Sequence, residues 1–153
     1  MFSTLLLLAV IVSAQAPESE IHGTVNDVMI GIIYPCSNIV FAAQSEDPYA
    51  PSEDFSFDYY GGRIEVGSAA IAVAESANLI AIPGRLCSNG TPAPVDTEDW
   101  KEWVEDMRTS GMAAYQAAQS ERQDALTEVT DQMAASCSSC HARYVDVTDR
   151  CPG

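Results

Sequence analysis

Five residues near the C-terminus, Cys137-Ser138-Ser139-Cys140-His141, form a Cys-x-x-Cys-His sequence. Two intervening residues let one helical turn present both sulfurs on the same side, with the imidazole next to the second thiol. An apolar stripe at three- and four-residue spacing runs through this sequence, formed by Leu126, Val129, Met133, Cys137, Cys140 and Tyr144. The sequence is therefore expected deep in a helix, with both cysteines on the buried face.

Two further helices are predicted upstream. Apolar periodicity predicts a first helix over residues 21–43, which Pro35 is expected to kink or split because proline removes a backbone hydrogen bond. A second helix is predicted over residues 63–82, ended by Pro83-Gly84. Its many small residues would allow close approach of a neighbouring helix or a flat ligand.

A third helix is predicted to begin after Asp96 or Thr97. Its apolar face comprises Trp100, Trp103, Val104, Met107, Gly111, Ala114, Tyr115 and Ala118. Ser120 and Gln123 have the spacing of a capping box, so the fourth helix is expected to begin at Ser120. Since no segment shows a strand pattern, the predicted fold class is all-α.

Residues 1–16 have the features of a secretory signal peptide, with an apolar stretch followed by Ala14-Gln15-Ala16. Cleavage after Ala16 leaves 137 residues, 17–153, enough for one domain with a core of its own. No other stretch is expected to approach the roughly 20 apolar residues of a membrane helix. The mature chain is thus predicted to be an exported, periplasmic protein without a membrane span.

The formal net charge of −15 argues against binding to nucleic acid or to an anionic membrane surface. Two interpretations of the acidity remain open. The charge supplies solubility, or it steers the protein toward a basic redox partner.

Cys-x-x-Cys-His is the attachment sequence of c-type haem. In that interpretation Cys137 and Cys140 form thioether bonds to the vinyl groups, and His141 ligates the iron. Attachment of this kind takes place after export, which agrees with the signal peptide. The alternatives are a zinc site that uses Cys151 as fourth ligand, and a disulfide between Cys137 and Cys140.

The position of CSSCHARY in the last of four predicted helices resembles class II c-type cytochromes, the cytochrome c′ group. The resemblance implies an antiparallel four-helix bundle with haem attached on the last helix, His141 as proximal ligand, and often a homodimer. Family members commonly carry a basic residue directly after the aromatic, whereas this chain has Val145 after Tyr144 and its cation, Arg143, before it. The chain therefore departs from the family pattern at this position.

In this family the first helix supplies the other axial position, for which Met29 is the candidate. Thioether ligation raises the reduction potential and suits electron transfer. The alternative is a core methionine packed near the haem. His22, two helical turns before Met29, is a further candidate ligand, with a surface histidine as its alternative.

The other methionines, Met107, Met112 and Met133, are expected in the core. Arg63 and Arg85 are candidates to pair with haem propionates, with solvated helix-end cations as the alternative. A disulfide is expected between Cys87 and Cys151, because both lie in predicted loops, and Cys36 is expected to be a small buried residue.

These features predict a soluble electron carrier rather than an enzyme, with haem and its iron as cofactor. The alternative is a five-coordinate haem protein that binds or senses nitric oxide or carbon monoxide. A peroxidase would need a distal acid–base group, and His22 is the obvious residue for it.

Overall fold

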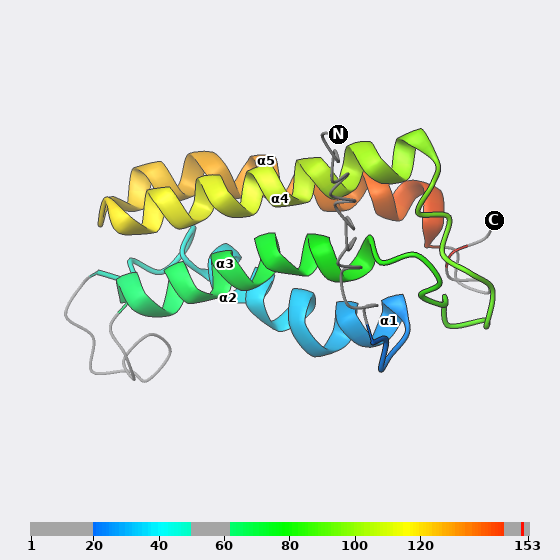
Figure 1. Ribbon diagram of the computed structural model, residues 1–153. Helices are drawn as coiled ribbons and strands as arrows, with labels where there is room; N and C mark the ends of the chain where they lie inside the picture. Colours follow the sequence, from blue (N-terminus) through cyan, green and yellow to red (C-terminus); the bar gives the residue numbers. More distant parts are fainter. Residues whose placement is uncertain (1–19, 50–61, 146–150, 152–153) are drawn as a thin grey trace, which may run out of the picture.

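The computed structural model describes residues 20–49, 62–145 and 151, which form an all-helical bundle (Figure 1). Its elements are α1 (Val25–Val28), η1 (Met29–Ile33), α2 (Tyr34–Ala42), α3 (Gly62–Ile80), α4 (Glu98–Gln119) and α5 (Gln123–Tyr144). The first three follow one another without a break and are together called the first helix. Because no β-strand forms within the described residues, the predicted all-α class is confirmed there. The predicted signal peptide, residues 1–16, lies outside them.

The helices form two layers, with α4 and α5 side by side in one and the first helix and α3 in the other (Figure 1). Small residues bring α3 close to α4, since a Cβ atom added to Gly111 would lie 2.9 Å from the backbone nitrogen of Ala74. The predicted close approach of the small-residue helix to a neighbour is therefore confirmed.

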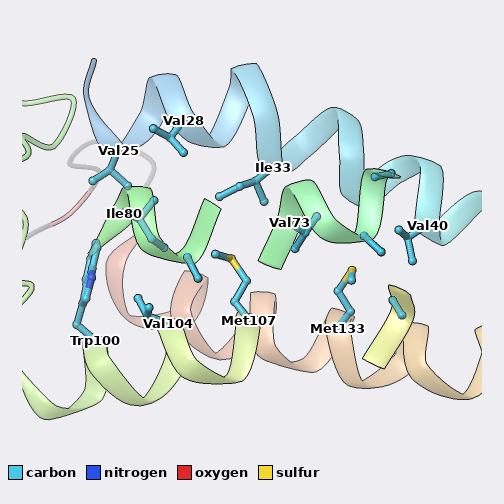
Figure 2. Packing of buried hydrophobic residues seen from close by; sticks show 14 of the residues in the cluster. Val25, Val28, Ile33, Val40, Val73, Ile80, Trp100, Val104, Met107 and Met133 are labelled. Atoms are coloured by element: carbon cyan, nitrogen blue, oxygen red, sulfur yellow. The ribbon is translucent and has the colours of Figure 1, made fainter. Parts of the chain in front are cut away.

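The core lies between these layers. Figure 2 shows Trp100, Val104 and Met107 pointing from α4 toward the first helix and α3. Met133 of α5 points into the same core and is completely buried (Figure 2). The predicted apolar faces are thus the buried faces of α4 and α5, and burial of such side chains contributes roughly 1.5–3 kcal/mol each.

Side-chain hydrogen bonds join the first helix to α5 at the end of the bundle where α5 begins. Gln44, just after α2, donates from Nε2 to the Thr130 hydroxyl oxygen. Gln123 donates from Nε2 to the carbonyl oxygen of Ala43 over 3.3 Å. The cavity described below opens between the same two helices toward their other end.

The first helix accommodates Pro35 by a change of hydrogen-bond register. A π-helical turn, η1, ends at Ile33, two residues before Pro35, and the backbone N–H of Tyr34 donates to the carbonyl of Met29, five residues back. Thr24 and Asp27 form a capping box at the start of this helix. The helix therefore passes Pro35 unbroken, and the expected interruption takes the form of a π turn.

The predicted start of the last helix is wrong. Ser120 lies at the end of α4, where its hydroxyl donates to the carbonyl of Ala117 over 2.6 Å. Glu121 has a φ of +54°, and Arg122 is the N-cap of α5. Ser120 thus satisfies a carbonyl at the C-terminus of α4 rather than a free N–H of α5. Of the two predicted cap residues of α4, Asp96 and Thr97, Thr97 occupies the N-cap position, but its side chain makes no capping hydrogen bond and donates to the Pro94 carbonyl instead.

The first helix also differs from expectation in its composition. By length and hydropathy alone, Val25–Ala42 is apolar enough to cross a membrane. In the bundle, 28% of this segment is buried. The prediction that only the signal peptide would come near this criterion is therefore wrong. In the structure the helix packs on α3, with Val25, Val28, Ile33 and Val40 in the core.

Candidate functional site

A cavity of about 350 Å³ lies between the first helix, α4 and α5. This volume is in the range of small-molecule sites in proteins, roughly 300–1,000 Å³. Its lining is mostly apolar. Four of the residues that the sequence singles out for cofactor binding line it, namely Met29, Cys137, Cys140 and His141.

The wall from α5 carries the Cys-x-x-Cys-His residues. Cys137 and Cys140 are half-buried and unpaired, and they occupy one turn of α5 as the spacing predicted. His141, the next residue, is exposed and also lines the cavity. One helical turn therefore offers the cavity two thiols and an imidazole.

Both thiols are protonated at neutral pH. Burial raises the pKa of Cys137. Burial, together with the negative charges that Cys137 and Asp99 can carry, raises the pKa of Cys140 to about 11. In these surroundings neither thiol is activated as a thiolate nucleophile.

Aromatic side chains form the end of the cavity where α4 begins. Tyr144 stacks edge-on against two tryptophans, with ring centroids 5.0 Å from Trp100 and 5.6 Å from Trp103. Trp100 is almost completely buried, and its indole nitrogen has no hydrogen-bond partner within the described part of the chain. An unsatisfied buried donor costs about 1–3 kcal/mol, so an acceptor brought by a ligand at this wall would be stabilising.

Asp99 anchors the aromatic cluster. It accepts a hydrogen bond from the Tyr144 hydroxyl over 2.8 Å, and the Thr97 hydroxyl lies 3.2 Å from the same tyrosine oxygen. Hydrogen bonds from Thr97 and Tyr144 lower the pKa of Asp99. Arg143 Nε lies 3.7 Å from the other Asp99 oxygen. The cation that precedes the aromatic residue therefore pairs with this carboxylate.

The first helix forms the opposite wall through residues spaced four apart. These are Val25, Met29, Ile33, Ser37 and Phe41. The residues that follow four of them also line the cavity, namely Asn26, Ile30, Tyr34 and Asn38. Met29 is half-buried and packs against the core. His22 is exposed and does not line the cavity, so the structure does not bring it to this site.

A disulfide between Cys87 and Cys151 closes this end of the bundle, which confirms the predicted pairing. Cys151 also donates its backbone N–H to the carbonyl of Tyr144 over 2.7 Å. The backbone N–H of Val25 donates to the carbonyl of Leu86 over 2.8 Å. The connection between α3 and α4 therefore holds both the start of the first helix and the end of α5.

Arg85 also helps to close this end of the bundle, and its environment differs from both predictions made for it. It is 4% exposed and donates from Nε to the Leu79 carbonyl and from Nη1 to the Gly23 carbonyl. It is thus not a solvated helix-end cation, and these donors are bonded to backbone rather than directed at a propionate. Arg63 lies at the start of α3 and pairs with Glu121 over 2.9 Å, away from the cavity lining.

Two alternatives for the cysteines disagree with the structure. The zinc site that uses Cys151 is wrong, because the disulfide with Cys87 removes that thiolate. The disulfide between Cys137 and Cys140 does not form, since both are free. Cys36 is likewise unpaired, and it is half-buried rather than buried. Among the described residues, no group of three or more His, Cys, Asp and Glu side chains is arranged to hold a metal ion.

Sequence reasoning missed Asp99 as the anchor of the aromatic cluster, and Ile30 and Tyr34 as cavity residues. Asp99 looked like an ordinary first-turn acid, and nothing in its sequence context indicates its contact with Tyr144. Ile30 and Tyr34 carried a usable signal. Together with Met29 and Ile33 they form two apolar pairs four residues apart just before a proline, and residues four apart share one face of a helix.

A scan against protein-family models, a search of curated proteins and a search of solved structures find no match to this chain. The resemblance to class II c-type cytochromes thus rests on the motif and its position, and it stays a prediction.

Proposed function

We propose that this chain is an exported monohaem c-type cytochrome that carries electrons. Haem is held covalently by Cys137 and Cys140, and His141 is an axial ligand. The observation that carries the proposal is that one cavity receives two unpaired thiols and an imidazole from α5 and a thioether from the first helix.

The residues present fit a haem. Covalent attachment requires two reduced thiols, and both are unpaired at the cavity wall. The apolar walls would keep water from most of a flat ring, and the indole N–H of Trp100 is a donor that an acidic group of the cofactor can satisfy. When bound, haem supplies an iron that exchanges one electron between its ferric and ferrous states.

Met29 is proposed as the sixth ligand. It lies on the wall that faces α5, as a second axial ligand must, and its sulfur would raise the reduction potential. The proposal includes an antiparallel bundle. It is supported by the three-residue connection between α4 and α5, residues 120–122, because short connections join antiparallel neighbours in such bundles.

The rest of the proposal concerns the protein's surroundings. Export to the periplasm agrees with the signal-like residues 1–16 and with the disulfide between Cys87 and Cys151, which is typical of an oxidising compartment. The net charge of −15 favours a basic redox partner.

A second candidate function is the binding or sensing of nitric oxide or carbon monoxide at a five-coordinate haem. The exposure of Ile30 (60%) and Tyr34 (66%) at the edge of the cavity favours it, because a small ligand could enter there. In this case Met29 would pack beside the haem without ligating it.

Absorption spectra of the mature chain, produced in an exporting host that attaches c-type haem, test both functions. Split, sharp bands on reduction without a carbon monoxide shift support the carrier, whereas a broad high-spin spectrum that shifts supports gas binding. Replacement of Cys137 and Cys140 by serine should remove all haem that survives acid–acetone extraction. The matched control is Cys36→Ser, which changes the remaining free thiol of the described residues and should retain the haem. Absence of haem from the unaltered chain would contradict both functions.

A further inference from the structure

The wall contributed by the first helix has an unusual spacing. Five of its residues line the cavity at intervals of four, namely Val25, Met29, Ile33, Ser37 and Phe41. An α-helix advances about 100° per residue, so a four-residue interval drifts by about 40° at each step. Over the whole wall a regular α-helix would accumulate a drift of about 160° and turn Phe41 away from Val25.

The π turn removes most of this drift. A π turn takes up one additional residue in a helix. From Val25 to Phe41 the rotation then corresponds to about 15 α-helical steps instead of 16, which leaves a drift of about 60°. The turn extends over Met29–Ile33, within the wall, and so places residues before and after it on one side of the helix.

Pro35 accounts for the π turn. It has no N–H to bond the carbonyl of Gly31, and its ring would clash with that carbonyl in a regular α-helix. The observed bond from the Tyr34 N–H to the Met29 carbonyl replaces the regular pattern just before the proline. Pro35 itself is exposed and does not line the cavity. It acts on the site only through the backbone.

We infer that Pro35 is a positioning residue, which through the π turn rotates Met29 toward the side of the cavity opposite His141 and thereby closes the sixth coordination position. The inference rests on the proposed haem function. In this inference the backbone of the first helix determines whether the sixth coordination position is closed by Met29 or open. The inference also explains why a helix-breaking residue lies in the middle of this helix.

The test uses the full chain matured with its haem, as wild type, Pro35→Ala and a deletion of Gly31. Alanine restores the N–H and favours a regular helix, and the deletion removes the additional residue directly. The matched control is Gly31→Ala in the same turn, where an added Cβ atom meets no atom within 4 Å. The readouts are extractable haem, spin state, carbon monoxide association rate and thermal midpoint.

Pro35→Ala should keep the covalent haem and should not lower the thermal midpoint, since proline is the poorest residue for a helix interior. It should nevertheless become high-spin and bind carbon monoxide at least tenfold faster, and the Gly31 deletion should do the same. Gly31→Ala should stay within twofold of wild type. Unchanged spin state and rate in both Pro35→Ala and the deletion, with haem attached, would overturn the inference while leaving the proposed function intact. A wild type without covalent haem would overturn both.

Discussion

The hydroxyl of Tyr144 donates to Asp99 Oδ1 over 2.8 Å, which joins the last turn of α5 to the first turn of α4. Tyr144 follows His141 by three residues, so this bond holds the end of the helix that carries the candidate ligand. Trp100 and Trp103 pack edge-on against the same ring. The geometry at His141 therefore depends on contacts made by the start of α4.

Tyr144→Phe should lower the free energy of unfolding by about 1 kcal/mol, because it removes this hydrogen bond and keeps the buried ring. Chemical denaturation of both proteins measures the difference. Tyr34→Phe is the matched control, since Tyr34 is 66% exposed, and its effect should stay within about 0.5 kcal/mol. Equal effects of the two substitutions would show that the hydroxyl of Tyr144 does not stabilise the bundle.

The lowered pKa of the Asp99 carboxylate predicts that the stability of the protein depends on pH. Hydrogen bonds from Thr97 and Tyr144 lower the pKa of Asp99 below its ordinary value of 3.8. Its contribution to stability is therefore complete above that value and is lost as pH falls through the lower pKa of the folded state. The difference in thermal midpoint between wild type and Asp99→Asn should be constant above about pH 4 and should shrink below it. A difference that grows with acidity would refute this assignment.

Apolar spacing predicted the helices and their buried faces correctly, because burial of a stripe such as Leu126, Met133 and Tyr144 dominates the energetics of a bundle. It also placed both motif cysteines on the cavity side of α5. The pairing of Cys87 with Cys151 followed from their positions in connections.

Features that depend on local competition for hydrogen bonds were not predictable in the same way. Ser120 matched the start of one helix and instead caps the end of another, since either role satisfies its hydroxyl. Arg85 looked like a surface cation because nothing in the sequence indicates that the carbonyls of Leu79 and Gly23 converge on it. Pro35 indicated an interruption, but its form as a π turn required the backbone itself.

Loss of the disulfide should be the most destabilising single change at the cavity end. Cys87 and Cys151 are separated by 64 residues, and opening a loop of this size in the unfolded chain corresponds to about 4 kcal/mol in the chain-entropy model. Replacement of both by serine should lower the thermal midpoint strongly. Cys36→Ser, at a free and half-buried thiol, is the control and should have a much smaller effect. If the two variants melted together, the disulfide would not contribute to stability.

Close packing of α3 on α4 predicts a strong effect of one added methyl group. In Gly111→Ala the new Cβ atom would lie 2.9 Å from Ala74 N and 3.0 Å from Ala74 Cβ, so the two backbones must separate. Overpacking of this kind costs about 1–3 kcal/mol, measurable by chemical denaturation. Gly31→Ala adds the same methyl group in open space and should not destabilise the protein. An unchanged stability of Gly111→Ala would mean that the helices separate without cost.

Met29→Leu removes the sulfur atom of Met29 and so distinguishes electron transfer from gas binding. Leucine keeps the volume and the apolar character of methionine but has no sulfur, so the fold should lose less than about 1.5 kcal/mol. If Met29 ligates the iron, the haem-loaded variant should change from low spin to high spin and its reduction potential should fall, because thioether ligation raises the potential. Met107→Leu is the control, since Met107 lines the same cavity from α4 and is expected to act only in packing. A low-spin spectrum and an unshifted potential in Met29→Leu would remove Met29 as a ligand, and a wild type already in the high-spin state would favour the gas-binding function instead.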